Sequence, residues 1–188
     1  MAVLSFGDAS FSRPGRTLLR PVSLTVECGE KAALACESAA AAWIAARMAA
    51  GIVKCTSGSV FVCDFDPKIQ PVHVKRFVGL VPCEPPRVPL HAEQYFAYRA
   101  ALWGLDEREA VERGMTLLSM SDGLDRAQQL ALAGALLHAP ALLILERPGD
   151  GLRAAAEAML GASALFATYG PGDRAVPLDA SLGARETP

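Results

Sequence analysis

The stretch from Lys31 to Val62, KAALACESAAAAWIAARMAAGIVKCTSGSVFV, determines the fold expected for this chain. Residues 31–35 are a short apolar run that predicts a buried strand, and Ser38 is well placed to cap an alanine-rich helix over 39–50. Gly51 ends that helix, and the Thr-Ser-Gly turn that follows leads into a strand predicted over 59–63. A strand, a tight bend, a helix and a further strand are typical of an α/β fold.

The rest of the chain continues to alternate between strand and helix patterns. Strands are predicted at 3–6, 17–19, 22–26, 78–81, 141–145, 164–168 and 175–178, and helices at 91–103, 107–120, 126–137 and 154–160. The proline-rich segment 81–90, VPCEPPRVPL, predicts a rigid connector without regular structure. This alternation predicts an α/β fold with a mostly parallel sheet and helices on both of its faces.

Length and charge limit the classes of function. The chain has 188 residues, a formal net charge of −2 and a pI near 5.9. A chain of this length buries about 70% of its unfolded surface, enough for one domain with a substantial core. A charge near zero gives no global attraction to nucleic acid or anionic lipid, so we expect no nucleic-acid partner.

The cysteine pattern and the apolar runs exclude further classes. The five cysteines include no C-x-x-C pair and only three histidines accompany them, so we expect no metal site. The N-terminus lacks a basic start, and no stretch reaches the roughly 20 apolar residues needed to span a bilayer. We expect a cytoplasmic protein without direct membrane insertion, peripheral at the inner face of the cell membrane only through a partner.

Six segments, in order along the chain, resemble the ATP-binding cassette (ABC) domain of ABC transporters. They are VSLTVECGEKAALA (22–35), GIVKCTSGSVFV (51–62), VGLVPCEP (78–85), SDGLDRA (121–127), QQLALAGALLHAPALLILERPGDGL (128–152) and ALFATYG (164–170). The resemblance implies a P-loop NTPase-like core (31–52, 76–84 and 128–188), a small antiparallel β subdomain (1–30 and 53–75) and a reduced helical subdomain (85–127).

The phosphate-binding loop departs from the family pattern. A working loop has the form G-x-x-x-x-G-K-[ST], whose backbone N–H groups, lysine and hydroxyl bind the phosphates and Mg²⁺. The corresponding positions here are Cys36, Glu37, Ser38, Ala39, Ala40, Ala41, Ala42 and Trp43. Ala41 stands for the last glycine, Ala42 for the lysine and Trp43 for the magnesium hydroxyl. Because alanine favours helix, we expect the helix to fill the phosphate space, and Glu37 to repel phosphate.

The other nucleotide-handling positions also differ from those of the family. Glu146 stands for the Walker B aspartate, Arg147 for the catalytic glutamate, Cys83 for the Gln-loop glutamine, Arg153 for the D-loop aspartate and Tyr169 for the switch histidine. A guanidinium cannot accept a proton from water, so Arg147 cannot act as the base. The Leu-Ser-Gly-Gly-Gln signature is deleted, because Arg126-Ala127 runs directly into Gln128-Gln129.

The resemblance and its departures together predict a pseudo-ATPase that uses no cofactor. We expect a structural or regulatory subunit that binds a membrane permease or an accessory protein, and possibly another ABC-type subunit. The residues expected to bind the partner lie on the connector and the helical subdomain: Cys83, Pro85, Pro86, Arg87, Tyr95, Tyr98 and Trp103. The alternative is an ATP-binding subunit of an ABC transporter that retains nucleotide binding or hydrolysis and therefore uses ATP and Mg²⁺.

Several side chains have competing interpretations. We expect Arg147 to reach into the vacated site and pair with Glu37 or Glu146, the alternative being a surface pair with Glu146. We expect Trp43 to fill the core. The aromatic residues of the 91–103 helix are expected to pack the subdomain core, with a partner interface as the alternative. A second functional alternative, a module for another ligand, requires a deep cavity between the first helix and Arg147.

Overall fold

The computed structural model describes residues 1–161 and 164–171. Within these ranges the chain forms the strands β1 (Ala2–Arg13), β2 (Arg16–Glu27), β3 (Lys31–Ala35), β4 (Ser57–Val62), β5 (Val78–Val81), β6 (Leu142–Glu146) and β7 (Ala164–Tyr169). The helices are α1 (Ala39–Ala49), α2 (Pro71–Phe77), α3 (Ala92–Trp103), α4 (Glu107–Ser119), α5 (Arg126–Leu136) and α6 (Asp150–Met159). The strand predicted at 175–178 lies outside the described residues.

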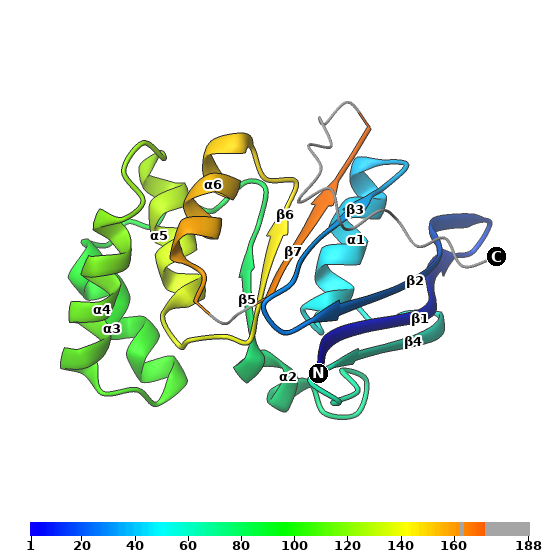
Figure 1. The fold of residues 1–188 in the computed structure, drawn as a ribbon, viewed down its shortest axis with the longest axis horizontal. Helices are drawn as coiled ribbons and strands as arrows, with labels where there is room; N and C mark the ends of the chain where they lie inside the picture. The colour runs from blue at the N-terminus through cyan, green and yellow to red at the C-terminus, as the bar shows by residue number, and fades with distance from the viewer. Residues whose placement is uncertain (162–163, 172–188) are drawn as a thin grey trace.

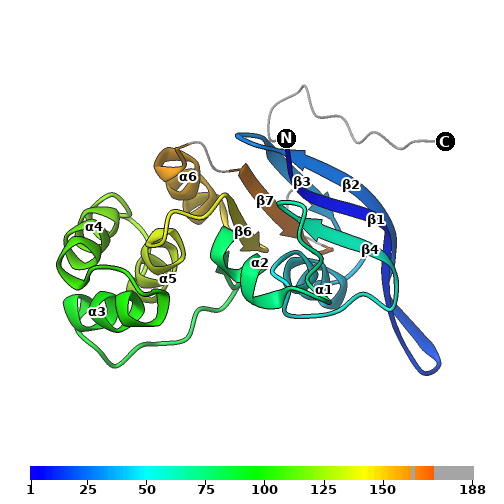
Figure 2. The same ribbon diagram turned by 90° about the horizontal axis from the view of Figure 1, so that it is seen from below.

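A parallel sheet forms the centre of the molecule, with strand order β3-β7-β6-β5 (Figure 1). All five residues of β6 are buried, as expected for a strand covered on both faces. Helix α1 lies on one face of this sheet, and α5 and α6 lie on the other (Figures 1 and 2). The predicted α/β fold with a mostly parallel sheet is therefore confirmed.

A smaller antiparallel sheet, with strand order β2-β1-β4, covers the opposite side of α1 (Figure 2). Its strands come from the two ranges expected to form the β subdomain. The separate strands predicted at 17–19 and 22–26 are one continuous strand, β2. Pro21 does not interrupt it because β2 lies at the edge of the sheet, where a missing N–H is tolerated.

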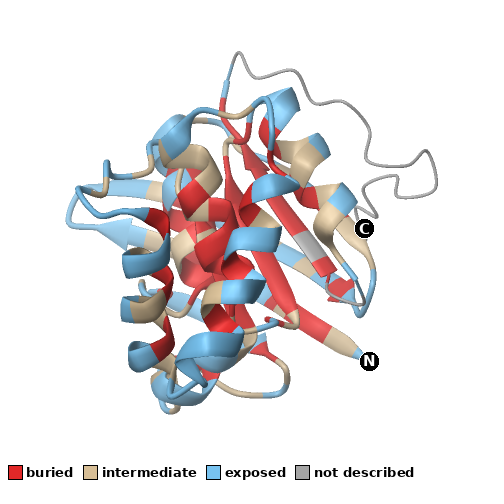
Figure 3. Ribbon diagram, turned by 90° about the vertical axis from the view of Figure 1, so that its left-hand side faces the viewer, coloured by how far each residue is buried: buried red, intermediate tan, exposed pale blue. Residues whose placement is uncertain are grey.

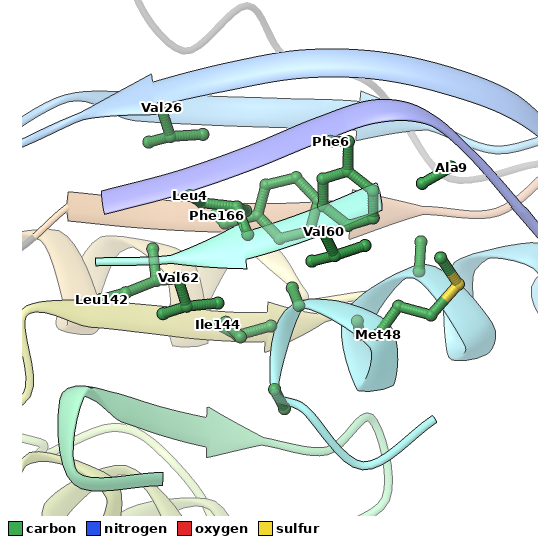
Figure 4. Packing of buried hydrophobic residues seen from close by; sticks show 14 of the residues in the cluster. Leu4, Phe6, Ala9, Val26, Met48, Val60, Val62, Leu142, Ile144 and Phe166 are labelled. Atoms are coloured by element: carbon green, nitrogen blue, oxygen red, sulfur yellow. The ribbon is translucent and has the colours of Figure 1, made fainter. Parts of the chain in front are cut away.

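Helix α1 fills the space between the two sheets. Ser38 caps it and Gly51, with a φ of 69°, follows its end, so the helix predicted over 39–50 is confirmed. Most of its side chains are buried, because alanine lets both sheets approach closely. Phe6 from β1 stacks on Phe166 from β7 with ring centroids 6.1 Å apart, and Met48 of α1 packs in the same cluster (Figure 4).

The remaining helices extend the molecule beyond α5 and α6. Helices α3 and α4 form an antiparallel pair that packs on α5 (Figures 1 and 2). The helices predicted at 91–103, 107–120 and 126–137 are confirmed to within a residue at each end. The helix predicted at 154–160 starts earlier, at Asp150, in a segment whose glycines lower helix propensity.

Helix α2 was not predicted from the sequence. It has seven residues, too few for a clear helical period, and Pro71 opens it at a position where proline is favourable. Burial elsewhere follows the layers: the sheet interior is buried and the outer helical faces are exposed (Figure 3). Among the described residues, no helix combines the length and apolarity that crossing a membrane requires.

Candidate functional site

The carboxyl-terminal edge of the parallel sheet brings most of the sequence-predicted positions together. The bend after β3, the residues after β6 and the end of β7 all lie at this edge, where open α/β sheets bind ligands. Three residues, 36–38, join β3 to α1. The backbone N–H of Cys36 donates to the carbonyl of Tyr169 at 2.7 Å, which ties this bend to β7.

Two of the N–H groups at the start of α1 are bonded within the helix. The Ser38 hydroxyl accepts from the N–H of Ala41 at 3.1 Å, and the Ser38 carbonyl accepts from the N–H of Ala42 at 3.0 Å. Ser38 is extended, with φ −151° and ψ 157°, as an N-cap residue is. Helix therefore begins where the resemblance places an open phosphate loop.

Protein groups also occupy the space beside the first residue of α1. A Cβ added to Gly170 would lie 3.3 Å from Nε of Arg147 and 3.4 Å from the backbone N of Ala39. Arg147 has a left-handed φ of 46°, and its N–H donates to the Thr168 carbonyl at 2.8 Å. The Arg147 side chain thus lies next to Gly170, close to the helix start.

Glu146, at the Walker B position, is 5% exposed and already paired with a cation. Nη1 of Arg47 lies 2.5 Å from Oε2 of Glu146. The Arg47 guanidinium also lies over the Trp43 ring, 4.2 Å from its centroid, one helical turn away on α1. The Arg47 guanidinium therefore supplies the opposite charge that the buried Glu146 carboxylate needs.

The predicted partner of Glu146 and the predicted place of Trp43 are corrected by these contacts. Among the described residues, Arg47 pairs with Glu146 and Arg20 pairs with Glu37 at 3.0 Å, so neither pair involves Arg147. Trp43 is 43% exposed instead of filling the core. Small residues already fill the tight space between the sheets, and the indole lies outside it, against Arg47.

The three other positions that the resemblance assigns to nucleotide handling lie at the same side of the sheet. Nη1 of Arg153, on α6, donates to Oη of Tyr169 at 3.4 Å, so the D-loop and switch positions contact each other. Cys83 is half-buried on the connector after β5. Burial, with a smaller contribution from Glu37, raises the pKa of the Cys36 thiol to about 11, so this bend holds no reactive thiolate.

A groove of about 660 Å³ separates the connector from the start of α5. Its lining residues are Cys83, Glu84, Pro85, Arg87, Val88, Asp125, Arg126, Ala127, Gln128 and Leu130. Three of the predicted partner-binding residues, Cys83, Pro85 and Arg87, lie here. The α5 wall was not predicted, although the Asp125–Gln128 capping box that shapes it can be recognised in the sequence.

The aromatic residues of α3 have different environments. Tyr95 packs against Phe96, with ring centroids 5.5 Å apart, and Trp103 stacks on His138 at 4.2 Å, so both belong to the subdomain packing. Tyr98 is 56% exposed, which corrects its assignment to the subdomain core. Pro86 lies on the connector but is not among the groove-lining residues.

A second cavity, of about 10 Å³, lies between the end of α1 and the segment 66–68. Neither this cavity nor the groove is the deep pocket between α1 and Arg147 that the ligand-module alternative requires. These two cavities give that alternative no support.

Sequence comparisons find relatives among bacterial transport proteins, although no family model matches the chain. ABC transporter ATP-binding protein NatA of Bacillus subtilis (strain 168) is 29% identical over 148 residues, covering 71% of this chain and 60% of that protein. Linearmycin resistance ATP-binding protein LnrL of the same organism is 25% identical over 150 residues, covering 73% and 48%. The chain thus aligns with about half of each relative's length.

Solved structures agree in fold. An ATP binding subunit of an ABC transporter superposes with a TM-score of 0.72 at 20% identity, covering 89% of this chain and 79% of that one. The cbiO1 subunit of the ABC transporter complex cbiONQ, from Clostridium perfringens, superposes with a TM-score of 0.70 at 19% identity, covering 89% and 78%. At these identities the likeness concerns the fold alone.

Proposed function

The homologues and structural neighbours of this chain are ATP-binding subunits of ABC transporters, and from this premise we propose that it is a pseudo-ATPase subunit of such a system. ABC ATP-binding subunits typically work with membrane permease subunits. In this proposal the chain binds a permease or an accessory protein at the inner face of the cell membrane and hydrolyses no ATP. The observation that carries the proposal is the closed start of α1, which offers no phosphate cradle.

A triphosphate would need backbone donors, and two of those at the start of α1 are already bonded. The N–H groups of Ala41 and Ala42 are bonded to Ser38, and no lysine stands at the start of the helix. Glu37, in the same bend, adds a negative charge that repels phosphate, and its pair with Arg20 at 3.0 Å reduces this repulsion in part. The dipole of α1 remains, and its attraction for an anion is much weaker than that of a complete loop.

Magnesium would lack its usual ligands as well. The residue at the hydroxyl position is Trp43, and the Glu146 carboxylate is paired with Arg47. Mg²⁺ requires oxygen ligands in near-octahedral geometry, and an arginine at 2.5 Å competes directly for the carboxylate oxygen. With Arg147 at the position of the base, the site lacks a group to activate water.

Docking would use the groove between the connector and α5. A volume of about 660 Å³ admits a short peptide segment, and the lining offers both basic (Arg87, Arg126) and acidic (Glu84, Asp125) side chains beside the apolar Val88 and Leu130. Two exposed residues of α3, Tyr98 and Leu102, would extend the contact, because a spacing of four residues puts them on one helical face.

A second candidate function is an ATP-binding subunit that retains nucleotide binding. The comparisons favour it, because the relatives NatA and LnrL are both named as ATP-binding proteins. Under this reading the N-terminus of α1 still holds phosphate, in a geometry that opens on binding.

Calorimetric titration with MgATP up to millimolar concentration separates the two candidates. The pseudo-ATPase proposal expects neither saturable heat nor thermal stabilisation. Glu37→Gln is the matched variant, because it removes the repulsive charge and keeps the size of the side chain. Saturable binding by the wild type that tightens in this variant would establish the second candidate and overturn the first.

Site-specific photocrosslinking tests the docking role. A crosslinker at Val88 should capture a polytopic membrane protein in native membranes, whereas one at the exposed Arg13 should not. Arg87→Glu combined with Tyr98→Ser should abolish that product. We prefer Tyr98 to Tyr95 or Trp103, because truncating the latter two would disturb the subdomain packing. Equal capture from both positions would contradict docking at the groove.

A further inference from the structure

Three aliphatic side chains around α2 are unusually exposed. Ile52 is 57% exposed, Ile69 is 78% and Val72 is 65%. Val72 shares the outer face of α2 with Lys75 and Arg76, which follow it by three and four residues, and Val74 is buried on the other side. The short helix therefore presents aliphatic and cationic groups together to the solvent.

Packing brings the segments before and after β4 to one place. A Cβ added to Gly51 would lie 3.1 Å from Cγ1 of Val74 and 3.2 Å from Cβ of Pro67, so residue 51 adjoins α2 and the loop before it. Nζ of Lys68 donates to the Gly58 carbonyl at 3.4 Å. We call the surface formed by Ile52, Ile69, Val72, Lys68, Lys75 and Arg76 the α2 patch.

Positive charge is concentrated at this patch in an acidic chain. Residues 51–77 contain three of the four lysines of the chain, and with Arg76 they outnumber Asp64 and Asp66. The formal charge of the segment is +2, against −2 for the whole protein. The Asp66 carboxylate is hydrogen-bonded within its own loop, because its Oδ1 accepts from the N–H of Lys68 at 2.7 Å. Lys75 and Arg76 share the exposed face of α2 with Val72, and Lys68 directly precedes Ile69 in the chain.

We propose that the α2 patch adsorbs to the surface of an anionic phospholipid bilayer. Ile52, Ile69 and Val72 would enter the headgroup boundary, while the lysines and Arg76 contact lipid phosphates. A surface of aliphatic groups flanked by cations matches an anionic interface, to which each basic residue adds attraction. This contact is local, so it is compatible with the negative net charge of the chain.

The shape of the patch favours a bilayer over a discrete ligand. The cavity beside it, lined in part by Lys54 and Lys68, has a volume of only about 10 Å³, too small for a headgroup. The cations are mainly lysines, compact charges on flexible stems, in a chain that otherwise relies on arginine. Flexible lysines suit many phosphates at a plane better than one fixed carboxylate or phosphate.

The experiment is co-flotation of the purified full chain with vesicles. One set is pure phosphatidylcholine, and the other contains about a third phosphatidylglycerol, which supplies the negative surface potential. The test variant is Lys75→Glu with Arg76→Glu. The matched control is Arg13→Glu with Arg16→Glu in the exposed β1–β2 turn, which changes the net charge by the same amount. Circular dichroism verifies that each variant is folded.

We expect binding to anionic vesicles only. Raising NaCl from about 0.1 M to 1 M should abolish it, because the screening length falls from about 10 Å to 3 Å. Replacing the two cations with glutamates should lower the partition coefficient by at least about 25-fold, because the loss of each cation alone accounts for about fivefold. Ile69→Ser with Val72→Ser should also weaken binding, and the control should bind like the wild type.

Two results would overturn the proposal. They are an absence of binding to anionic vesicles and an equal loss in the test and control variants. In the first case, binding of the chain to polyglutamate would assign the patch to an acidic protein segment. None of these outcomes depends on nucleotide binding or on the groove, so the inference stands or fails separately from the proposed function.

Discussion

Arg47 Nη1 lies 2.5 Å from Oε2 of Glu146, and this ion pair joins two residues that are 99 positions apart in the sequence. Both side chains are largely buried at the carboxyl-terminal edge of the parallel sheet. Under the proposed function, the Arg47 guanidinium supplies at Glu146 the positive charge that a bound metal ion would otherwise supply.

The first prediction concerns the stability of this pair. Arg47→Met leaves a buried carboxylate without a partner and should lower the free energy of unfolding by about 3–5 kcal/mol. Arg47→Met combined with Glu146→Leu should recover most of that loss, because no charge is then left unpaired. Urea denaturation of the wild type, both single variants and the double variant measures the coupling. An unchanged midpoint for Arg47→Met would mean that water solvates Glu146.

The second prediction concerns rebuilding the phosphate loop. Ala41→Gly, Ala42→Lys and Trp43→Thr together should not produce ATP hydrolysis above background, because under the proposed function Arg147 stands at the position of the base and the signature segment is missing. Phosphate release by the purified variant measures this. A quadruple variant that also carries Arg147→Glu has a carboxylate at the position of the base, and it therefore tests the contribution of that position. ATP turnover by the triple variant would contradict the inference that the signature segment is missing.

The third prediction compares two helical glycines. A Cβ at Gly114 on α4 would lie 2.4 Å from Cγ of Phe96, so Gly114→Ala should destabilise the protein by about 1–3 kcal/mol despite the better helix propensity of alanine. A Cβ at Gly151 on α6 would make an ordinary 3.6 Å contact with Leu124. Gly151→Ala should therefore be neutral or slightly stabilising. Thermal unfolding of both variants decides this, and a rise in Tm for Gly114→Ala would refute the overpacking.

The fourth prediction concerns pH. Burial, aided by Arg99 and Arg113, outweighs the bond to the Val78 carbonyl and lowers the pKa of His138 from 6.5 to about 4. Because the folded state binds this proton less readily than the unfolded state, the stability contribution is present above about pH 6.5 and is lost as the pH falls toward 4.

Denaturant unfolding between pH 7.5 and about 4.5 measures this loss. Carboxylates also titrate in the lower part of this range, so the relevant quantity is the difference between the wild type and His138→Gln. The difference should shrink as the pH falls. A difference that stays constant would show that His138 does not contribute to the pH dependence.

Local patterns in the sequence determined most of the elements of the fold. Ser38 and Gly51 mark the ends of α1, and the apolar run of β6 marks a strand buried on both faces. These signals depend on residues close together in the chain, so one sequence is enough to read them. The proposed replacement of the loop lysine by Ala42 and of the base by Arg147 likewise rests on residue identity.

Tertiary structure decided which side chains meet. Alanines of α1 lie on nearly every side of the helix. The sequence therefore contains no apolar stripe that would predict whether Trp43 points inward. The two sheets lie close together, so the space between them holds the alanine side chains of α1 and is too narrow for the indole of Trp43. The pairing of Glu146 with Arg47, and not with its neighbour Arg147, follows from how α1 lies across β6. Sequence determined which groups are present at this site, and the packing of α1 between two sheets determined their partners, because contacts between distant segments depend on the whole fold.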